Sequence, residues 1–333
     1  MASVGARTAV GGAGAHPSGS RAVLGLDVGG TKMAAGVVGA DGGVEGFVVG
    51  TTDARLGPRD GLERLFALGR SAVAAAGAGA DEIAGIGIAC GGPLDSARGV
   101  LIAPLHLPGW TDVPITELAA AAFDLPAVLD NDATAAAAAE HRHGAGRGTR
   151  NMVYLTVSTG VGGGVVLDGR LFRGSTGNGG ELGHVTVDWH GRLCRGCGRR
   201  GCLEAYASGT SIAERAREAG MEVATSADVA AAARAGDAVA TRVWNETCEA
   251  LACGVTSLAN LFEPELVVIG GGVSRAGEQL LGPVRELVHA QAIDPPGRKV
   301  GIVQAALGEA VGVVGAAAVA YERLGSGATS GER

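Results

Sequence analysis

The stretch Leu26-Asp27-Val28-Gly29-Gly30-Thr31-Lys32 ends one β-rich run and begins the next, and it decides how the first half of this 333-residue chain folds. Runs rich in β-forming residues cover 23–28, 33–38 and 44–49, with glycine turns between them. Gly-rich turns between such runs are hairpin signals. The sequence therefore predicts three consecutive strands joined by tight turns.

A second copy of this pattern lies at residues 152–172. There a glycine loop, Ser158 to Gly164, follows the run 152–157, and the turn Asp168-Gly169 separates the runs 165–167 and 170–172. The recurrence indicates an internal duplication. Further strands are expected at 83–89, 126–130, 266–269 and 299–304, and helices at 59–76, 114–123, 132–142, 208–219, 226–235, 238–261, 276–290 and 309–323. This alternation implies a mixed sheet covered on both faces, twice over, and two such lobes leave a cleft that suits a ligand.

Composition excludes several classes of function. The chain has 27 Lys and Arg against 34 Asp and Glu, a net charge of -7, which argues against a broad nucleic-acid surface. We find no apolar run long enough to span a membrane, and residues 1–20 lack the apolar core of a signal peptide. Cys90, Cys248 and Cys253 lie in apolar patterns, so a reducing cytoplasm fits best.

Residues 181–204 combine one His and three Cys with two flanking Glu. One imidazole and three thiolates are the ligand set of a tetrahedral structural zinc, and glycines let the loop turn tightly around one ion. His190 is an alternative to the first ligand, and buried thiols or a disulfide are the alternatives to a metal. Glu181 and Glu204 would be held rigidly, which suits recognition of hydroxyls. The ligand candidates are His184, Cys194, Cys197 and Cys202, and a solvated rim is expected for Arg192, Arg195, Arg199 and Arg200.

The two glycine turns can point backbone N–H groups at a polyphosphate. Either turn alone is weak evidence, because an ordinary tight turn has the same composition, but a pair in duplicated units is stronger. Asp27 could hold water around a magnesium ion or cap its turn. The cluster Gly270 to Gly272 follows an apolar strand and suits a nucleoside. Neither a P-loop nor a complete dinucleotide fingerprint is present.

The run 126–130 ends in Asp130-Asn131-Asp132 and passes directly into an Ala-rich helix. Asp and Asn are good helix N-caps, which is the structural explanation for this cluster. One residue suffices for a cap. The others are free to face the cleft, where a carboxylate could accept the proton of an attacking hydroxyl.

Taken together, these motifs resemble the ROK family of bacterial glucokinases and related sugar kinases and repressors, over residues 22–323. The resemblance implies a duplicated α/β fold of the actin/hexokinase-like (ribonuclease H-like) type, with two lobes and a central cleft. The matching segments are 26–32 and 158–164 for the phosphates, 267–274 for adenosine, 85–95 for the sugar loop and 177–204 for the zinc signature.

The resemblance also implies roles for individual residues. Asp132 would be the catalytic base, and His184 would serve the sugar, the zinc or both. The expected sugar contacts are Gly92, His106, Asn131, Asp132, Glu181, His184 and Glu204. The expected ATP and Mg²⁺ contacts are Asp27, Gly29, Gly30, Thr31, Lys32, Thr159, Gly160, Gly162, Gly163, Gly270, Gly271 and Gly272.

Two departures from the family pattern matter. The zinc loop has Cys194-x-x-Cys197 where the family commonly has Cys-x-Cys, a spacing that zinc also accepts. His106 stands where glucokinases of the family usually carry Asn. The imidazole either donates the same hydrogen bond to the sugar or changes the preferred acceptor.

We therefore predict a cytoplasmic kinase that uses ATP, Mg²⁺ and a structural Zn²⁺, and transfers the γ-phosphoryl group to the 6-OH of a hexose, foremost glucose. N-acetylmannosamine, another hexose or a cyclitol are the alternative acceptors. A sugar-responsive repressor is less consistent, since about 22 residues precede the first strand. The predicted kinase would bind a small sugar and ATP, and neither nucleic acid nor a membrane. It would form a homodimer or a homotetramer. Expected regions are tails at 1–20 and 326–333, a smaller lobe of 21–132 plus helix 310–325, and a larger lobe of 133–309 with the zinc loop 184–202.

Overall fold

The computed structural model describes residues 21–53, 57–293 and 299–325. The tails expected at 1–20 and 326–333 lie outside these described residues. The chain divides into two compact units. Unit 1 comprises residues 1–143 and 309–333, and unit 2 comprises residues 144–308.

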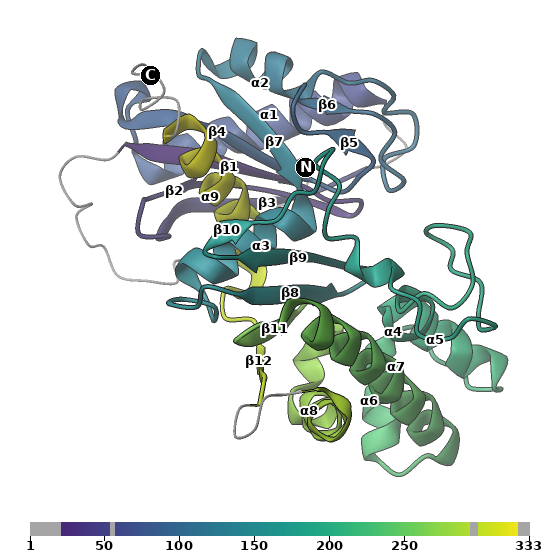
Figure 1. Cartoon of the computed structure of the whole chain (residues 1–333). Helices are drawn as coiled ribbons and strands as arrows, with labels where there is room; N and C mark the ends of the chain where they lie inside the picture. Colours follow the sequence, from purple (N-terminus) through teal and green to yellow (C-terminus); the bar gives the residue numbers. More distant parts are fainter. Residues whose placement is uncertain (1–20, 54–56, 294–298, 326–333) are drawn as a thin grey trace. The chain divides into compact units, whose positions relative to one another are not determined.

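Unit 1 is built on a five-stranded sheet in the order β3-β2-β1-β4-β7 (Figure 1). The first three strands pair antiparallel, β4 pairs parallel with β1, and β7 pairs parallel with β4. The strands are β1 (Ala22–Val28), β2 (Lys32–Val38), β3 (Val44–Thr51), β4 (Ile83–Cys90) and β7 (Ala127–Asn131), with a small hairpin of β5 (Leu94–Asp95) and β6 (Val100–Leu101).

Helices cover both faces of this sheet. Leu26 and Ile88 belong to an apolar cluster on one face that also includes Leu65 of α1 and Ala119 of α2. On the other face α9 packs so closely that a Cβ at Gly87 would clash with its backbone. The helices of the unit are α1 (Pro58–Ala76), α2 (Ile115–Phe123), α3 (Asp132–His143) and α9 (Val311–Gly325), with the 3₁₀ turn η1 (Ala80–Glu82).

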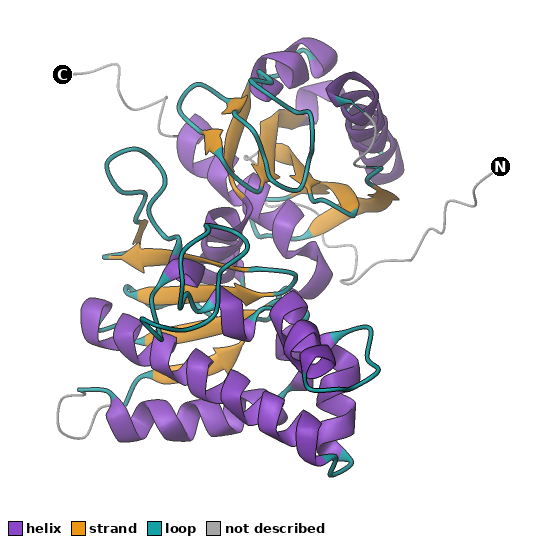
Figure 2. Ribbon diagram, turned by 90° about the vertical axis from the view of Figure 1, so that its right-hand side faces the viewer, coloured by secondary structure: helices purple, strands orange, loops and turns teal. Residues whose placement is uncertain are grey.

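Unit 2 repeats this sheet in the order β10-β9-β8-β11-β12, again with three antiparallel strands followed by two parallel ones. Figure 2 shows the long helices that pack on it. The strands are β8 (Met152–Val157), β9 (Val161–Leu167), β10 (Arg170–Leu171), β11 (Leu266–Gly270) and β12 (Gly301–Gln304). The helices are α4 (Glu204–Ala207), α5 (Gly209–Glu218), α6 (Ser226–Arg234), α7 (Ala238–Phe262) and α8 (Glu278–Gln291), with the 3₁₀ turns η2 (Leu182–His184), η3 (Val273–Ala276) and, where the chain returns to unit 1, η4 (Gly308–Ala310).

The shared strand order is the duplication that the sequence indicates, and two details differ from expectation. The contacts place α3 in unit 1, so the boundary expected after Asp132 moves to His143. Strand β9 begins at Val161, not at Val165, because Gly162 and Gly163 pair with Thr156 and Leu155 of β8. The second glycine turn is therefore only Ser158 to Gly160.

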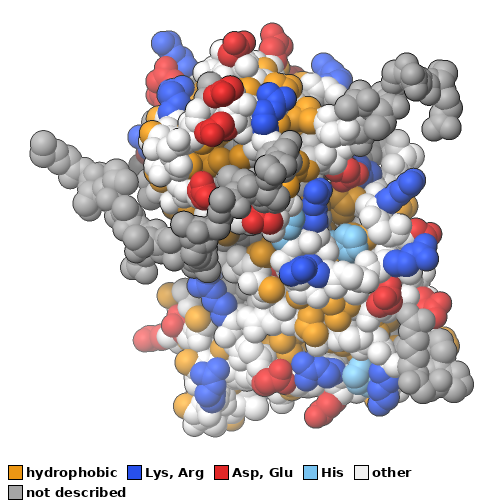
Figure 3. Space-filling view, turned by 90° about the vertical axis from the view of Figure 1, so that its left-hand side faces the viewer, with side chains coloured by type: hydrophobic (Ala, Val, Ile, Leu, Met, Phe, Trp, Pro, Cys, Tyr) orange, Lys and Arg blue, Asp and Glu red, His pale blue; other side chains and the backbone are white. Residues whose placement is uncertain are grey.

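The surface carries charges of both signs. On the face drawn in Figure 3, acidic and basic side chains are interspersed, without a large patch of one sign. Within the described part of the chain, no helix has both the length and the apolar character needed to cross a bilayer.

Candidate active site

The three polar residues at the end of β7 and the start of α3, 130–132, make different contacts. Asp130 is buried and pairs with Arg323 of α9, with 3.1 Å between Oδ2 and Nη2. Asn131 caps α3, because its Oδ1 accepts a hydrogen bond of 3.0 Å from the backbone N–H of Ala133. Asp132 Oδ1 accepts from the same N–H at 2.8 Å, and the residue stays exposed to solvent. Asp130 is thus structural, and Asp132 is the carboxylate that remains open to a ligand.

A second carboxylate lies near this one in unit 1. Burial raises the pKa of Asp27 from 3.8 to about 7; the negative charge of Asp132 adds to the rise and Lys32 opposes it. Desolvation by the surrounding protein also raises the pKa of Asp132, against the effects of the Ala133 N–H and of the His106 charge. Solvent screens this second shift, because Asp132 keeps an exposed surface. Two carboxylates with raised pKa values are typical of a site that receives a cation or a proton.

The first glycine turn links β1 to β2. It is closed by a hydrogen bond of 3.0 Å from the Gly29 N–H to the Lys32 carbonyl. Thr52 holds it from the side, since its Oγ1 donates to the Gly29 carbonyl at 2.7 Å and its N–H donates to the Thr31 carbonyl at 2.9 Å. Thr31 and Lys32 are exposed, so they are accessible to a phosphate group.

His106 packs against the same turn. Its Nε2 lies 3.3 Å from the Val28 carbonyl oxygen and 3.8 Å from Cys90 Sγ. A Cβ at Gly30 would come within 2.9 Å of the His106 Cβ, and one at Gly91 within 2.6 Å of its Cε1. The imidazole therefore lies between the first glycine turn and the loop that follows β4. Its contact with a sugar stays a prediction.

The sugar loop begins where β4 ends. Gly92 lies beside the Asn131 amide, because a Cβ at this position would be 4.0 Å from Asn131 Nδ2, an ordinary van der Waals contact. Since the Asn131 Oδ1 is engaged in capping α3, its Nδ2 is the atom that remains to donate to a hydroxyl. Gly92, Asn131, Asp132, His106 and the first glycine turn thus belong to one region of unit 1.

The second glycine turn links β8 to β9 in unit 2. The Ser158 N–H donates to the Gly160 carbonyl at 2.9 Å, and Ser158 and Thr159 are exposed. Gly162 and Gly163 lie within strand β9 and not in the turn itself, and their contact with ATP stays a prediction. At Gly163 a Cβ would come within 2.6 Å of the Leu182 side chain. That glycine is required for packing of η2 onto the sheet.

The third glycine cluster meets the second turn. Gly271 has a φ of +86°, and a Cβ there would clash with the Val157 carbonyl at the end of β8. The Ser274 hydroxyl donates to the Gly271 carbonyl at 2.8 Å, which fixes the start of η3. Gly270 to Gly272 and Ser158 to Gly160 therefore lie side by side at the carboxyl ends of β11 and β8, where α/β sheets bind ligands.

The four zinc-ligand candidates converge in unit 2. The ligand atoms of His184, Cys194, Cys197 and Cys202 all lie within 4.8 Å of one another. His184 Nδ1 is 3.7 Å from Cys194 Sγ, and the Sγ atoms of Cys197 and Cys202 are 3.5 Å apart. A tetrahedral site with Zn–S bonds of about 2.3 Å requires about 3.8 Å between its thiolates, so the geometry fits zinc. All six cysteines of the chain are free thiols, which argues against the disulfide alternative.

We use the name zinc knuckle for residues 184–202. Its turns depend on glycine: Gly201 has a φ of +77°, and a Cβ there would clash with the Asp188 carbonyl. Arg199 Nη2 donates to the His184 carbonyl at 2.9 Å and lies 3.9 Å from Cys202 Sγ. His190 is exposed and outside the cluster, which removes it as the alternative ligand.

Glu204 lies between the zinc knuckle and the second glycine turn. Its Oε2 accepts a hydrogen bond of 2.9 Å from the Val161 N–H, and its Oε1 lies 3.4 Å from Cys194 Sγ. A Cβ at Gly160 would come within 2.7 Å of this carboxylate, and one at Gly196 within 2.5 Å. Glu181 is exposed and begins η2. Of the two glutamates, only Glu204 is fixed by bonds to both segments.

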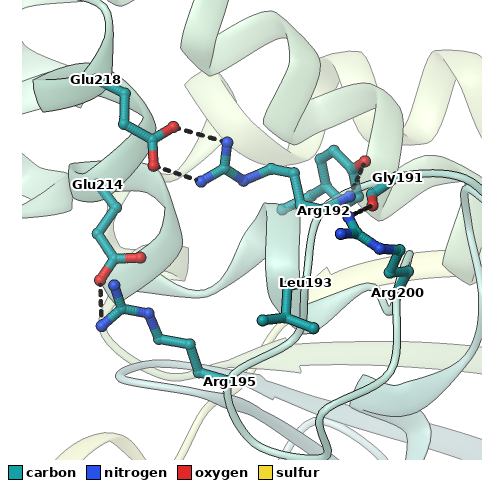
Figure 4. Close-up of a pocket in the computed structure, with 8 residues that line it drawn as sticks. Gly191, Arg192, Leu193, Arg195, Arg200, Glu214 and Glu218 are labelled. Carbon is teal, nitrogen blue, oxygen red and sulfur yellow. Dashed lines mark hydrogen bonds and ion pairs between the residues drawn. The ribbon is translucent and has the colours of Figure 1, made fainter.

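The outer side of the zinc knuckle forms a groove of about 570 Å³ against α5 (Figure 4). Arg192 makes two bonds of 2.7 and 2.8 Å to Glu218, and Arg195 pairs with Glu214 at 2.9 Å. Arg195, Arg199 and Arg200 are exposed, as expected of a solvated rim, while Arg192 is partly buried; Arg192 and Arg195 in addition pair with acidic residues of α5. None of the predicted sugar or nucleotide contacts lines this groove.

Several positioning residues escaped the sequence analysis. Arg215 of α5 is buried, and its Nη2 donates to the Tyr206 carbonyl of α4 at 2.7 Å and to the Thr247 hydroxyl. Thr52 and Thr210 each bond the backbone of a glycine turn. Isolated Thr and Arg residues carry no motif, so only the folded contacts identify them.

The sequence and the fold are both similar to those of known proteins. The sequence profile of the ROK family matches residues 23–323. The chain belongs to the ROK family. It is 37% identical to a glucokinase of Thermotoga maritima over 91% of this chain and 98% of the relative. It is 38% identical to an N-acetylmannosamine kinase of Yersinia pseudotuberculosis over 88% of this chain and 96% of that relative.

A solved structure has the same fold. The ROK family glucokinase from Streptomyces griseus, in complex with glucose and AMPPNP, superposes with a TM-score of 0.75 at 34% identity, over 90% of this chain and 99% of the other. As a member of the ROK family the chain has the actin/hexokinase-like fold, in agreement with the fold class expected from its sequence.

Proposed function

We propose that this ROK family member is an ATP-dependent sugar kinase that phosphorylates the 6-OH of glucose. The observation that carries the proposal is Asp132, an exposed carboxylate at the tip of a parallel strand, in the same unit as an exposed Thr31-Lys32 turn. The similarity to glucokinases over nine-tenths of the chain supports the reaction and favours glucose.

In this proposal Asp132 accepts the proton of the 6-OH as the hydroxyl attacks the γ-phosphorus of ATP, and ADP leaves. Backbone N–H groups of the exposed glycine turns are the candidate donors to the phosphates, and Asp27 would hold water around Mg²⁺. A bound magnesium ion would supply neutralisation of charge on the phosphates, while the protein orients the two reactants. The carboxylate of Asp27 suits this task, because a nearby cation favours its ionised form despite burial.

We further propose that the zinc knuckle binds one Zn²⁺ through His184, Cys194, Cys197 and Cys202. The set of three sulfurs and one imidazole nitrogen is closed, so the ion would shape the loop without taking part in the reaction. A cytoplasmic location supplies both ATP and the reducing conditions that keep these thiols free.

The alternative acceptor is N-acetylmannosamine, which the comparable identity to a kinase for that sugar favours. His106 bears on this choice, because it replaces the Asn that the family's glucokinases usually carry. An assay that couples ADP release to a visible signal, run on glucose, mannose, N-acetylmannosamine, N-acetylglucosamine and inositol, tests the proposal. We expect the highest kcat/KM with glucose. If the protein phosphorylates none of these acceptors, the proposed kinase function is contradicted. A clear preference for N-acetylmannosamine would contradict the assignment of glucose as the acceptor.

A further inference from the structure

The two glycine turns occupy the same place in the two sheets, yet different elements hold them. In unit 1 β3 runs for eight residues beside β2, and Thr52, just after it, bonds the first turn twice. In unit 2 the strand at the corresponding position, β10, has two residues and pairs with Val166 and Leu167, at the end of β9 away from the turn. The brace that β3 provides has no counterpart in β10.

The chain that leaves the zinc knuckle supplies a different brace. Glu204 follows the ligand candidate Cys202 by two residues, and its Oε2 accepts the hydrogen bond from Val161, the first residue of β9. A Cβ at Gly160 would come within 2.7 Å of this carboxylate and one at Gly196 within 2.5 Å, so the carboxylate packs closely between the turn and the knuckle. The carboxylate therefore fixes the end of the turn against the knuckle.

The start of α5 holds the other end of the same turn. The Gly209 N–H donates to the Ser158 carbonyl at 2.7 Å, and the Thr210 hydroxyl donates to the Thr159 carbonyl at 2.9 Å. Three hydrogen bonds from residues 204–210 thus replace the two that Thr52 makes in unit 1.

We propose that Glu204 is a positioning residue for the nucleotide as well as an acceptor contact. Its Oε2 fixes the second phosphate turn and leaves Oε1 for a sugar hydroxyl. This inference rests on the proposed kinase function and adds that nucleotide affinity depends on a residue of the acceptor site.

Isothermal titration calorimetry with ADP in the absence of sugar tests the inference on the full chain. Glu204→Ala removes the bond to Val161, and a charge-assisted bond of this kind corresponds to about a tenfold increase in the Kd for ADP. Glu204→Gln keeps an amide oxygen that can accept the same N–H, so we expect an increase of about threefold or less. Glu181→Ala is the matched control, because among the described residues Glu181 makes no hydrogen bond to the turn; the Kd for ADP should stay within about twofold of wild type, while the KM for the sugar rises.

Metal content and thermal unfolding show whether Glu204→Ala is folded. Should it not fold, Thr210→Val carries the test, since it removes only the bond to Thr159 and should raise the Kd for ADP about threefold. An unchanged Kd for ADP in a folded Glu204→Ala, or in Thr210→Val when the first variant is unfolded, overturns the inference. Failure of the kinase function is distinct from both, because then the wild-type protein itself neither binds ADP nor phosphorylates a sugar.

Discussion

Units 1 and 2 have the same sheet, and they differ in what the sheet supports. In unit 1 the strand tips present carboxylates, Asp27 and Asp132, beside a turn that the sheet's own third strand stabilises. In unit 2 the third strand is reduced to two residues, and the zinc knuckle with α4 and α5 fixes the turn. The comparison indicates that the two copies of a duplicated fold can have different roles. In the proposed reaction, unit 1 would supply the carboxylate that accepts the proton, and unit 2 would supply a turn that is fixed by the zinc knuckle and α5.

The largest expected effect follows from the reactive carboxylate of unit 1. Asp132→Asn keeps the shape of the residue and removes its ability to accept a proton, so kcat should fall by at least about a hundredfold. The Kd for glucose, measured by calorimetry, should stay within about threefold of wild type. A kcat within tenfold of wild type would place the base elsewhere.

Loss of the knuckle metal should affect unit 2 and leave unit 1 intact. Cys202→Ser removes a buried ligand candidate; we expect loss of one zinc per chain by mass spectrometry and a Tm lower by about 10 °C, which corresponds to about 3–5 kcal/mol in a domain of this size. Cys253→Ser, a cysteine outside the cluster, is the control and should keep the metal. Wild-type protein purified without chelators but free of zinc would contradict the assignment.

The raised pKa of Asp27 predicts that its ionised carboxylate destabilises the ligand-free protein. Between pH 4 and 7 the folded state retains a proton that the unfolded chain, with a pKa near 3.8, has released, so this group makes the protein less stable as the pH rises through that window. Asp27→Asn cannot ionise. We therefore expect the ligand-free variant to be more stable than wild type at pH 8, by about 1–3 kcal/mol after allowance for solvent screening.

Calorimetric unfolding at pH 8 and pH 4 checks this expectation, and the gain should vanish at the lower pH. Equal destabilisation of the variant at both pH values would show that the carboxylate is stabilising and that its pKa is not raised.

The smallest effect concerns the two side-chain braces. Thr52→Val removes the hydroxyl that donates to the Gly29 carbonyl, as Thr210→Val does for the second turn, and each should raise the Kd for ADP about threefold with the KM for glucose unchanged. Thr51→Val is the control, because that side chain is exposed on β3. If only one of the two variants raises the Kd for ADP, the two turns do not contribute equally to nucleotide binding.

Periodicity and turn chemistry alone predicted most of the fold. Each predicted strand and helix is present, because alternating apolar runs bounded by glycine describe buried strands in both units. The start of β9 was missed, since Gly162 and Gly163 have the composition of a loop and only their packing against Leu182 shows why a strand contains them. The boundary at α3 was missed because it depends on contacts between α3 and α9, which lie far apart in the sequence.

The candidate site was less accessible to sequence reasoning. The zinc knuckle was predictable, because its ligands are close together and their spacing is restrictive. The separate tasks of Asp130 and Asn131 were not, since the pairing of Asp130 with Arg323 spans most of the chain. Nor could the sequence indicate that Glu204 accepts a hydrogen bond from Val161, because a sequence motif identifies the residue but not where its carboxylate points.

The most direct test of the account is a crystal structure of the protein with glucose and a non-hydrolysable ATP analogue. We expect the glucose 6-OH to lie within hydrogen-bonding distance of the Asp132 carboxylate, and backbone N–H groups of a glycine turn to contact the phosphates. A sugar bound away from Asp132, or a nucleotide that contacts neither turn, would contradict it.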